Sequence, residues 1–375
     1  MKITREYQNL GTFLKPNKAL VILGPLRSGK TTLLNDFLSG SSLKYKLDSG
    51  DDIRVQEVLS SQDFDKILAY ASGYQLVAID EAQRIKNVGL GLKILIDHAP
   101  GIYIIATGSS SFELSGQVGE PLTGRKITLT LYPIAQMELA KMHNRFELKA
   151  KLEESLIFGS YPEVVTAADR NEKIRLLNEL VGSYLLKDIL QLERVKSAKV
   201  LLDLLRLLAF QVGNEVSWSE LGNRLGIDTK TVARYLDLFE KGFVIYNLRG
   251  FSRNLRKEIS KKSKYYFLDT GIRNAVISNF NPLELRDDAG LLWENFLITE
   301  RLKKQAYRGI HANNYFWRTW DQKEVDFIEE REGRLFGYEF KWGSGKVKPA
   351  REWLETYAGA EFAIVNPENY LDFVL

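Results

Sequence analysis

The first third of the chain alternates short apolar runs with segments of helical character. Apolar runs at 19–23, 76–79 and 102–106 have the length of buried strands, and polar or glycine-rich residues follow each of them. The segment 32–38, between the first two runs, has the apolar spacing of a helix. Strands that alternate with helices in this way form a parallel sheet covered on both faces. The pattern therefore predicts an α/β fold with a doubly wound parallel sheet.

The middle of the chain is helical and then changes to strand-like runs. Residues 148–199 have helical periodicity with a break at 159–162, and their recurring leucines are expected to be packing residues. Further helices are expected over 201–210, 217–227 and 229–240, and strands over 243–248 and 265–268. Asp228 is placed to cap the helix that begins at Thr229. Helices joined by a glycine-containing turn and followed by a hairpin indicate a winged helix-turn-helix.

The last hundred residues indicate a small α/β domain. A helix is expected from Gly290 to about Lys304, and another after Pro349. Strands are expected over 315–320, 324–328, 334–342 and 363–365. The strand at 324–328 alternates polar and apolar residues, so one of its faces is polar.

A glycine-rich loop follows the first apolar run and precedes the first helix. It has the pattern G-x-x-x-x-G-K-T, in which backbone N–H groups surround phosphate oxygens and the helix N-terminus adds its positive dipole. Lys30 is expected to reach the β and γ phosphates, and the Thr31 hydroxyl to bind Mg²⁺. The sequence thus predicts an ATP–Mg²⁺ site. Its candidate nucleotide-binding residues are Gly24, Pro25, Arg27, Ser28, Gly29, Lys30, Thr31 and Thr32.

Polar residues also follow the other two predicted strands of this sheet. Asp80 is expected to hold Mg²⁺ together with Thr31, and Glu81 to orient or deprotonate the attacking water. Thr107 and Ser109 are placed to sense the γ-phosphate or to position that water. An acidic first turn of a helix would also explain Asp80 and Glu81, but the upstream loop favours the catalytic interpretation.

Arg125 follows Gly124 in a predicted loop and is a candidate for neutralising transition-state charge. It could act on the nucleotide of its own chain or on that of a neighbouring copy in a homo-oligomer. An ordinary surface arginine is an equally good interpretation.

Composition narrows the chemistry further. The chain of 375 residues is 45% hydrophobic, which predicts more than one globular domain. It contains no cysteine, which excludes disulfides, thiolate metal sites and cysteine nucleophiles, and its three histidines, His98, His143 and His311, are not spaced as zinc ligands. No apolar run is long enough for a membrane span, and no signal peptide is evident, so a cytoplasmic protein without a membrane partner is expected.

Basic residues are concentrated in the middle of the chain. The net charge is +4, yet the segment between Arg194 and Arg273 holds 16 basic and 8 acidic residues. This imbalance favours an anionic partner, and the predicted winged helix indicates double-stranded DNA. A module that packs between other domains or binds protein remains the alternative. The candidate DNA-binding residues are Lys230 and Arg234 on the recognition helix and Arg253, Arg256, Lys257, Lys261 and Lys262 in the wing.

The C-terminal strands carry a second candidate site for metal-dependent chemistry. Asp326, separated by twelve residues from Glu339-x-Lys341, resembles the active-site signature of restriction-endonuclease-like proteins. Residues two apart in a strand share a face, so Glu339 and Lys341 should point together. Asp326 and Glu339 are expected to bind Mg²⁺, Lys341 to position the attacking water, and Glu294 to supply a third carboxylate. Arg318 and Gln322 could contact phosphate. Strands with one polar face are common, so a domain of this shape that binds without cutting remains open.

Several motifs together resemble a prokaryotic family of AAA-type ATPases with a C-terminal domain of unknown function. They are GPLRSGKTTLL (24–34), DEAQ (80–83), ATGSSS (106–111), LTGRKITLTLYPIAQMEL (122–139) and FGSYPEVV (158–165). The chain departs from the family where Leu26–Arg27 replaces a basic pair and where Ala135–Met137 replaces a Ser-Phe before Glu138. The resemblance implies that the helical segment is a small lid over the nucleotide.

These observations combine into four predicted domains. They are a P-loop ATPase core at 1–145, a helical lid or linker at 146–198, a winged helix-turn-helix at 199–275 and a restriction-endonuclease-like α/β domain at 280–375. The predicted function is a Mg²⁺-dependent ATPase coupled to DNA binding, with DNA cleavage as a further expectation. The alternative is a nucleotide-dependent signalling switch whose nuclease-like domain is inactive and binds DNA or a protein partner.

Overall fold

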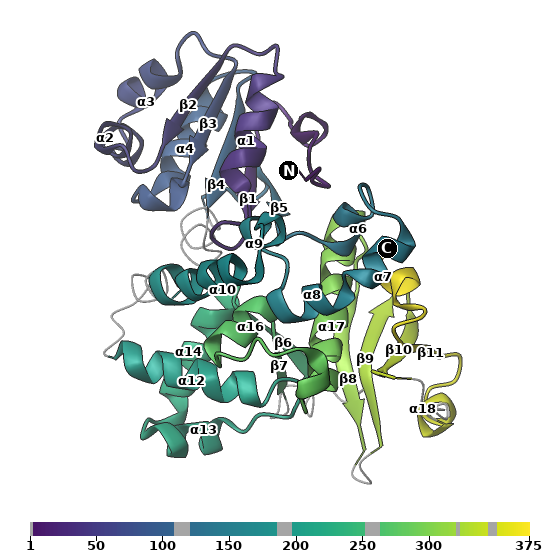
Figure 1. Cartoon of the computed structure of the whole chain (residues 1–375). Helices are drawn as coiled ribbons and strands as arrows, with labels where there is room; N and C mark the ends of the chain where they lie inside the picture. The colour runs from purple at the N-terminus through teal and green to yellow at the C-terminus, as the bar shows by residue number, and fades with distance from the viewer. Residues whose placement is uncertain (1–2, 109–120, 186–196, 252–262, 320–322, 344–350) are drawn as a thin grey trace. The chain divides into compact units, whose positions relative to one another are not determined.

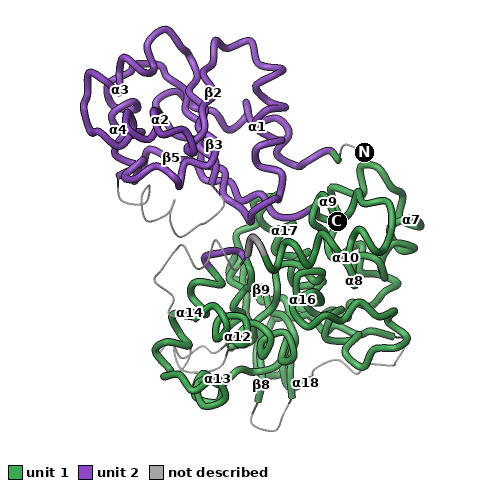
Figure 2. Tube along the Cα trace, turned by 60° about the vertical axis from the view of Figure 1, so that its left-hand side comes forward, with its two compact units in different colours: residues 1–3, 134–240, 244–375 green, residues 4–133, 241–243 purple. Residues whose placement is uncertain are grey.

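The computed structural model describes residues 3–108, 121–185, 197–251, 263–319, 323–343 and 351–375. The chain divides into two compact units (Figure 2). The N-terminal unit consists of Thr4–Pro133 together with Lys241–Phe243, and the C-terminal unit contains Ile134–Glu240 and Val244–Leu375. Four separate domains were predicted. The helical segment, the three helices with their hairpin and the last α/β segment lie together in one compact unit, which begins at Ile134, and the division into four domains stays a prediction.

The N-terminal unit is built on a five-stranded parallel sheet with the order β2-β3-β4-β1-β5 (Figure 1). The predicted doubly wound parallel sheet is thereby confirmed. The strands β2 and β5 were not predicted. β2 lacks the apolar run of a buried strand because it is polar and partly exposed at the sheet edge. The strands are β1 (Ala19–Leu23), β2 (Tyr45–Ser49), β3 (Leu76–Asp80), β4 (Tyr103–Gly108) and β5 (Lys126–Thr130).

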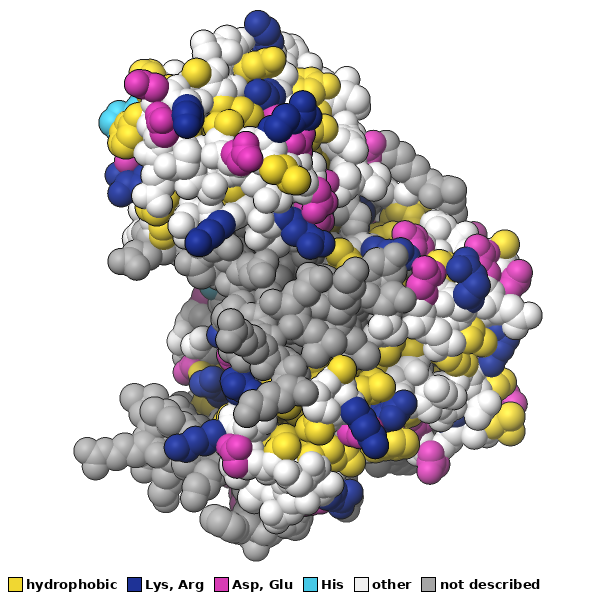
Figure 3. All heavy atoms as spheres, turned by 90° about the vertical axis from the view of Figure 1, so that its left-hand side faces the viewer, with side chains coloured by type: hydrophobic (Ala, Val, Ile, Leu, Met, Phe, Trp, Pro, Cys, Tyr) yellow, Lys and Arg dark blue, Asp and Glu magenta, His cyan; other side chains and the backbone are white. Residues whose placement is uncertain are grey.

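Helices cover this sheet because its central strands are apolar on both faces. All five residues of β1 are buried. Ala19, Val21 and Leu23 face a core shared with α2, α3 and α4, whereas α1 contacts β4 and lies outside that core. The helices are α1 (Lys30–Ser39), α2 (Ile53–Ser60), α3 (Phe64–Ala71) and α4 (Val88–His98), with short 3₁₀ turns at Leu10–Thr12 and Ala82–Arg84. On the face that Figure 3 shows, basic and acidic side chains are interspersed over this unit.

The C-terminal unit begins with a helical layer. Asp228 caps α14, as predicted, because its carboxylate accepts the backbone N–H of Thr231 at 2.9 Å. The first helices of the unit are α6 (Gln136–Leu139), α7 (Arg145–Ala150), α8 (Leu152–Phe158), α9 (Pro162–Thr166), α10 (Arg170–Glu179) and a π-helical stretch (Leu180–Leu185). They are followed by α12 (Ala198–Phe210), α13 (Trp218–Leu225), α14 (Thr229–Lys241), α16 (Thr270–Val276), a 3₁₀ turn (Leu283–Leu285) and α17 (Ala289–Arg308), and the chain ends with α18 (Arg351–Thr356) and α19 (Tyr370–Val374).

A six-stranded mixed sheet with the order β11-β10-β9-β8-β6-β7 forms the other part of this unit (Figure 1). Its strands are β6 (Ile245–Gly250), β7 (Ser263–Phe267), β8 (Asn313–Arg318), β9 (Glu324–Arg331), β10 (Arg334–Phe340) and β11 (Glu361–Val365). The antiparallel hairpin β6–β7 joins the later strands because β6 pairs in parallel with β8 at Arg249 and Gly250. The predicted hairpin and the predicted C-terminal domain therefore share one continuous sheet.

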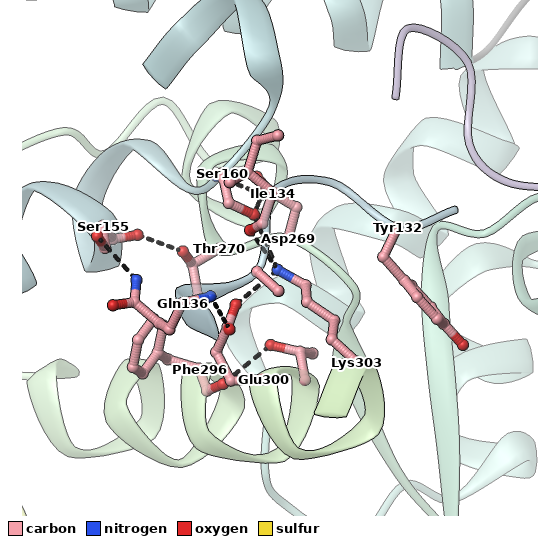
Figure 4. Close-up of polar contacts among 12 residues, drawn as sticks. Tyr132, Ile134, Gln136, Ser155, Ser160, Asp269, Thr270, Phe296, Glu300 and Lys303 are labelled. Atoms are coloured by element: carbon pink, nitrogen blue, oxygen red, sulfur yellow. Dashed lines mark hydrogen bonds and ion pairs between the residues drawn. The ribbon is translucent and has the colours of Figure 1, made fainter. Parts of the chain in front are cut away.

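A buried network of charged side chains holds the start of this unit to α17 (Figure 4). The Lys303 ammonium donates to Glu300 Oε1 at 2.6 Å and to Ser160 Oγ at 3.0 Å. The backbone N–H of Gln136 donates to Glu300 Oε2 at 2.6 Å, and that of Ser160 donates to Asp269 Oδ2 at 2.7 Å. Both Glu300 and Lys303 are 2% exposed, so each charge depends on its partners rather than on water.

Within the described segments, no helix has the length and apolar composition needed to cross a bilayer.

Candidate functional site

The glycine-rich loop between β1 and α1 adopts the backbone that its glycines were predicted to allow. Gly29, the residue before α1, has φ +96°, and Gly24 has φ +155°. A Cβ on Gly24 would lie 2.1 Å from the carbonyl oxygen of Leu131, so only glycine fits there. Arg27 also has a positive φ of 59°. The loop therefore curls tightly before the first helix turn, as a phosphate-binding loop must.

Polar groups of the loop point toward its interior. The buried Lys30 ammonium donates hydrogen bonds to the carbonyl oxygens of Gly24 and Pro25 at 3.0 and 2.8 Å. The Ser28 hydroxyl is fully buried and has no hydrogen-bond partner among the described residues. A buried hydroxyl without a partner is unfavourable unless a ligand completes its hydrogen bonding. The loop thus presents an ammonium and a hydroxyl where the sequence predicts phosphate.

Three neighbouring strands bring the other predicted residues to one edge of the sheet. The Thr31 hydroxyl donates to Asp80 Oδ2 at 2.7 Å, and the Thr107 hydroxyl donates to the other oxygen of the same carboxylate. Asp80 ends β3, Thr107 lies at the end of β4, and Thr31 follows the loop after β1. The hydroxyl of Thr31 and the carboxylate of Asp80 are oxygen ligands of the kind that Mg²⁺ prefers, so these two residues fit the predicted metal site.

Glu81 is held in a defined position next to Asp80. Its backbone has φ 50°, and its backbone N–H donates to the Thr107 hydroxyl at 3.2 Å. Its carboxylate accepts a hydrogen bond from Gln83 Nε2 at 2.5 Å. Burial raises the pKa of Glu81, although the Lys30 ammonium acts in the opposite direction. A carboxylate with a raised pKa is a better proton acceptor, which suits the predicted role in activating water.

The sequence did not single out Arg5, which supports the loop from outside. Its guanidinium donates to the backbone oxygen of Ser28 at 2.6 Å and to that of Tyr132 at 2.5 Å. Arg5 thereby connects the phosphate-binding loop to the residues after β5. No motif surrounds Arg5 in the sequence, so only the long-range contacts reveal it.

Arg125 lies where the parallel strands of the sheet begin, whereas the loop lies where they end. β5 runs parallel to β1 with Lys126 opposite Ala19 and Thr130 opposite Leu23, so Arg125 precedes the strand whereas the loop follows Leu23. β5 has five residues, and a parallel strand rises about 3.3 Å per residue, so the full length of the strand separates Arg125 from the end of the sheet where the loop lies. Arg125 Nε instead pairs with Asp97 at 2.8 Å. In this structure Arg125 is therefore directed away from the loop of its own chain, and its role in charge neutralisation stays a prediction.

The residues predicted for the nucleotide site also include Pro25, Thr32 and Ser109. Pro25 is buried in the loop and Thr32 is exposed in the first turn of α1. Ser109 lies outside the described residues.

The predicted DNA-binding residues are described only in part. Lys230 and Arg234 are both exposed on α14, four residues apart and therefore on one face of the helix. Arg253, Arg256, Lys257, Lys261 and Lys262 lie outside the described residues.

The predicted nuclease-like residues come together in the C-terminal sheet. The antiparallel register of β9 and β10 brings Asp326 next to Glu339, and Asp326 Oδ2 accepts the backbone N–H of Phe340 at 2.7 Å. Lys341 Nζ lies 2.6 Å from Glu339 Oε1, while Phe340 is buried, so the predicted alternation of side chains is confirmed. Burial raises the pKa of Asp326 well above its usual value, and the nearby carboxylates of Glu294 and Glu339 raise it further.

Glu294 contacts groups that the sequence did not assign to this site. Tyr266 donates its hydroxyl to Glu294 Oε1 at 2.5 Å, and Lys264 Nζ lies 3.6 Å from the same oxygen. Lys264 also pairs with Glu324. We call Lys264, Glu294, Glu324, Asp326, Glu339 and Lys341 the acidic cluster. Within the described part of the chain, no three acidic or histidine side chains are arranged to hold a metal ion.

Lys264 escaped prediction because it ends a basic segment of the predicted wing, where it resembles the lysines expected to contact phosphate. Arg318, predicted to contact phosphate, instead lies 3.4 Å from Glu215 and 3.9 Å from Glu324. Gln322 lies outside the described residues.

Family models match three consecutive parts of the chain. Residues 16–140 match an AAA domain, residues 149–283 match a domain of unknown function (DUF8612), and residues 289–370 match another domain of unknown function (DUF4143). The boundary between the first two matches lies close to the boundary between the two units. The match to DUF8612 ends after the hairpin β6–β7, although that hairpin shares its sheet with the later strands.

Similar chains occur in bacteria and archaea. An uncharacterized protein of Mycobacterium tuberculosis is 27% identical over 357 residues, which cover 94% of this chain and 77% of the relative. An uncharacterized protein of Haemophilus influenzae is 26% identical, with 88% of this chain and 84% of the relative covered. One from Methanocaldococcus jannaschii is 27% identical, with 84% and 73% covered. The similarity therefore spans both units.

Solved structures with similarity to the chain include a Signal Transduction ATPase with Numerous Domains (STAND) protein with a tetratricopeptide repeat sensor from Pyrococcus horikoshii. It has 12% identity and a TM-score of 0.31, with 81% of this chain and 46% of that chain covered. A structure concerned with katanin self-assembly has 19% identity and a TM-score of 0.24, with 40% and 51% covered. The AAA-domain match and the geometry of the loop agree: residues 16–140 are similar to an AAA domain and contain a loop shaped to bind phosphate.

Proposed function

We propose that the N-terminal unit binds ATP with Mg²⁺ and hydrolyses it. The observation that carries this proposal is the hydrogen-bonded group of Thr31, Asp80 and Thr107, which joins the ends of three strands beside the phosphate-binding loop. Lys30 and the backbone N–H groups of the loop would hold the phosphates, and Thr31 with Asp80 would hold Mg²⁺. The metal would neutralise charge on the phosphates. Glu81, fixed by Thr107 and Gln83, would accept a proton from the attacking water.

The test is the rate of Mg²⁺-dependent ATP hydrolysis by wild type, Lys30→Ala and Glu81→Gln. We expect Lys30→Ala to lose nucleotide binding and Glu81→Gln to retain binding while hydrolysis falls by about a hundredfold or more. Lys86→Ala is the matched control because Lys86 is an exposed lysine of the same unit. The proposal fails if the wild type has no Mg²⁺-dependent nucleotide affinity, or if Lys30→Ala hydrolyses ATP at the wild-type rate.

The same proposal includes binding of double-stranded DNA by the C-terminal unit. The support is the order α12, α13, α14 and hairpin, the exposed Lys230 and Arg234 on α14, and the basic composition of the segment 194–273. Lysine and arginine contacts with phosphate release counterions, so affinity should fall steeply with salt. Lys230→Ala with Arg234→Ala should weaken binding and reduce this salt dependence. Lys86→Ala with Arg308→Ala, two exposed basic residues elsewhere, should not. Absence of affinity at low salt would contradict DNA binding.

We further propose that Arg125 acts on the nucleotide of a second copy of the chain. The support is its position at the edge of the sheet opposite its own loop. An inactive Arg125→Ala protein mixed with an inactive Lys30→Ala protein should then recover activity. The Lys30→Ala copy supplies Arg125, and the Arg125→Ala copy supplies a loop with Lys30. If Arg125→Ala alone retains the wild-type rate, this part of the proposal is wrong.

A second candidate function is a nucleotide-dependent switch whose C-terminal unit binds DNA or a protein without cutting it. The observation that favours it is the acidic cluster, in which Lys264 already pairs with two carboxylates. The discriminating measurement is Mg²⁺- or Mn²⁺-dependent cleavage of duplex DNA by wild type, Asp326→Ala and Lys341→Ala. Cleavage that both substitutions abolish would favour a nuclease, and its absence in the wild type would favour the switch. Stimulation of ATP hydrolysis by DNA would favour the coupled ATPase, and stimulation by a protein alone would favour the switch.

A further inference from the structure

We propose that the Lys264 ammonium occupies the cation position of the acidic cluster, so that this cluster does not bind a divalent metal while Lys264 remains there. The nuclease-like interpretation requires such a metal at Asp326 and Glu339. The proposal rests on the acidic cluster of the second candidate function and is independent of ATP hydrolysis by the N-terminal unit.

Lys264 is enclosed among carboxylates. Its residue is 3% exposed, and its ammonium forms an ion pair with Glu324 and lies 3.6 Å from Glu294 Oε1. An ammonium cannot be buried in this way without nearby negative charge. Burial by itself would lower the pKa of Lys264, but Glu294 and Glu324 outweigh that effect and raise it. Lys264 is therefore a positively charged member of the cluster.

The other carboxylates already have hydrogen-bonding or ionic partners. Tyr266 donates to Glu294 at 2.5 Å, the backbone N–H of Phe340 donates to Asp326 at 2.7 Å, and Lys341 lies 2.6 Å from Glu339. A divalent cation needs several oxygen ligands directed at one point. While Lys264 is present, the cluster instead directs its oxygens at separate donors, in agreement with the lack of a three-ligand group in the described segments.

The strand that carries Lys264 is fixed to α17, so the backbone of Lys264 is held close to Glu294. Asn295 on α17 accepts the backbone N–H of Phe267 at 2.8 Å and donates to the Phe267 oxygen at 2.7 Å. Glu294, the neighbouring residue on the same helix, contacts Lys264 and Tyr266. β7 is therefore held to α17 by side chains at both Phe267 and Lys264.

This arrangement ties the basic hairpin to the C-terminal sheet. β7 starts at Ser263, directly after the segment predicted to contact DNA. The ion pairs of Lys264 connect that hairpin to α17 through Glu294 and to β9 through Glu324. Lys264 is thus a positioning residue for the hairpin, and the cluster serves to join elements rather than to activate water.

The test is Mn²⁺ binding by the full-length protein without nucleotide, measured by electron paramagnetic resonance. All proteins carry Asp80→Asn so that the ATP site contributes little. On this background we expect weak Mn²⁺ binding that Asp326→Asn does not change. Lys264→Met, which keeps the length of the side chain and removes its charge, should increase Mn²⁺ affinity at least tenfold. Adding Asp326→Asn to Lys264→Met should abolish the gain.

Two controls keep the result interpretable. Lys323→Met removes a largely exposed lysine that pairs with Glu352 near the start of β9, and it should not increase Mn²⁺ affinity. Lys264→Arg keeps the charge and should also give no increase. The proposal is overturned if the background protein binds Mn²⁺ and Asp326→Asn abolishes that binding. This outcome can be measured even if Lys264→Met does not fold. It is also overturned if folded Lys264→Met shows no gain. Neither outcome affects MgATP binding by the wild type, which tests the proposed ATPase separately.

Discussion

The hydroxyl of Thr31 donates a 2.7 Å hydrogen bond to Oδ2 of Asp80. Thr31 lies in the first turn of α1 and Asp80 is the last residue of β3, 49 positions further along the chain. β4 lies between β1 and β3 in the sheet, and its Thr107 donates to the same carboxylate. Two motifs that are separate in the sequence are therefore parts of one site.

Removing the negative charge of Asp80 should separate the metal-dependent part of nucleotide binding from the rest. In Asp80→Asn the remaining side-chain oxygen can accept from one of the two threonine hydroxyls, and the amide NH2 can donate to the other. We expect this substitution to weaken binding of MgATP about tenfold or more, equivalent to roughly 1.4 kcal/mol. Binding of ATP in EDTA should change little. Isothermal titration calorimetry with and without Mg²⁺ makes the comparison. An equal loss under both conditions would mean that Asp80 maintains the loop and not the metal.

Gly24→Ala should damage the phosphate-binding loop, because the added Cβ would lie 2.1 Å from the carbonyl oxygen of Leu131. We expect a loss of about 2 kcal/mol or more in the free energy of unfolding, together with a loss of ATP affinity. Urea denaturation and calorimetry measure the two effects. Gly290→Ala is the matched control, since its Cβ would meet no atom within 4 Å in α17, and it should be neutral or slightly stabilising. Wild-type affinity in Gly24→Ala would show that Leu131 moves easily.

Lys303→Met should destabilise the C-terminal unit strongly. The substitution keeps the volume of the side chain but leaves the buried carboxylate of Glu300 without its ion pair (Figure 4). Breaking a buried pair in this way costs about 3–5 kcal/mol. Thermal and urea unfolding measure the loss. Lys149→Met is the comparison, because Lys149 pairs with the exposed Glu368 and should lose at most about 1 kcal/mol. Similar losses in the free energy of unfolding for both variants would mean that burial of the ion pair does not determine the loss.

Asp288 should make stability depend on pH in the acid range. Burial opposes ionisation, but hydrogen bonds and charges from Arg286 and Arg273 lower the pKa of Asp288 to about 2. A carboxyl with a lowered pKa in the folded state stabilises the fold above its unfolded pKa, and this contribution disappears as pH falls from about 4 to 2. Asp288→Asn should therefore lose about 2 kcal/mol at pH 7 and progressively less toward pH 2. Urea unfolding across this range measures the difference. A constant loss at every pH would mean that the ionisation of Asp288 does not matter.

Local patterns were sufficient for most of the elements and for the nucleotide loop. The run 19–23, the loop with Gly24, Gly29 and Lys30, and the cap at Asp228 depend on neighbouring residues, so their structure can be read from the sequence. The polar edge strand β2 was missed because its residues lack the apolar run that marks a buried strand. The pairing of Asp326 with Glu339 was also predictable, since a short hairpin determines which residues face each other.

What the sequence alone determined about this protein is therefore the set of local elements and the chemistry at the ends of the first strands. Only the tertiary structure decided which edge of the sheet holds Arg125, that Arg5 supports the loop, and that Lys264 lies among carboxylates rather than on the wing surface. The physical reason is distance along the chain. Helix periods, caps and glycine turns involve residues a few positions apart, whereas these three arrangements depend on strand order and on contacts between residues 20 or more positions apart.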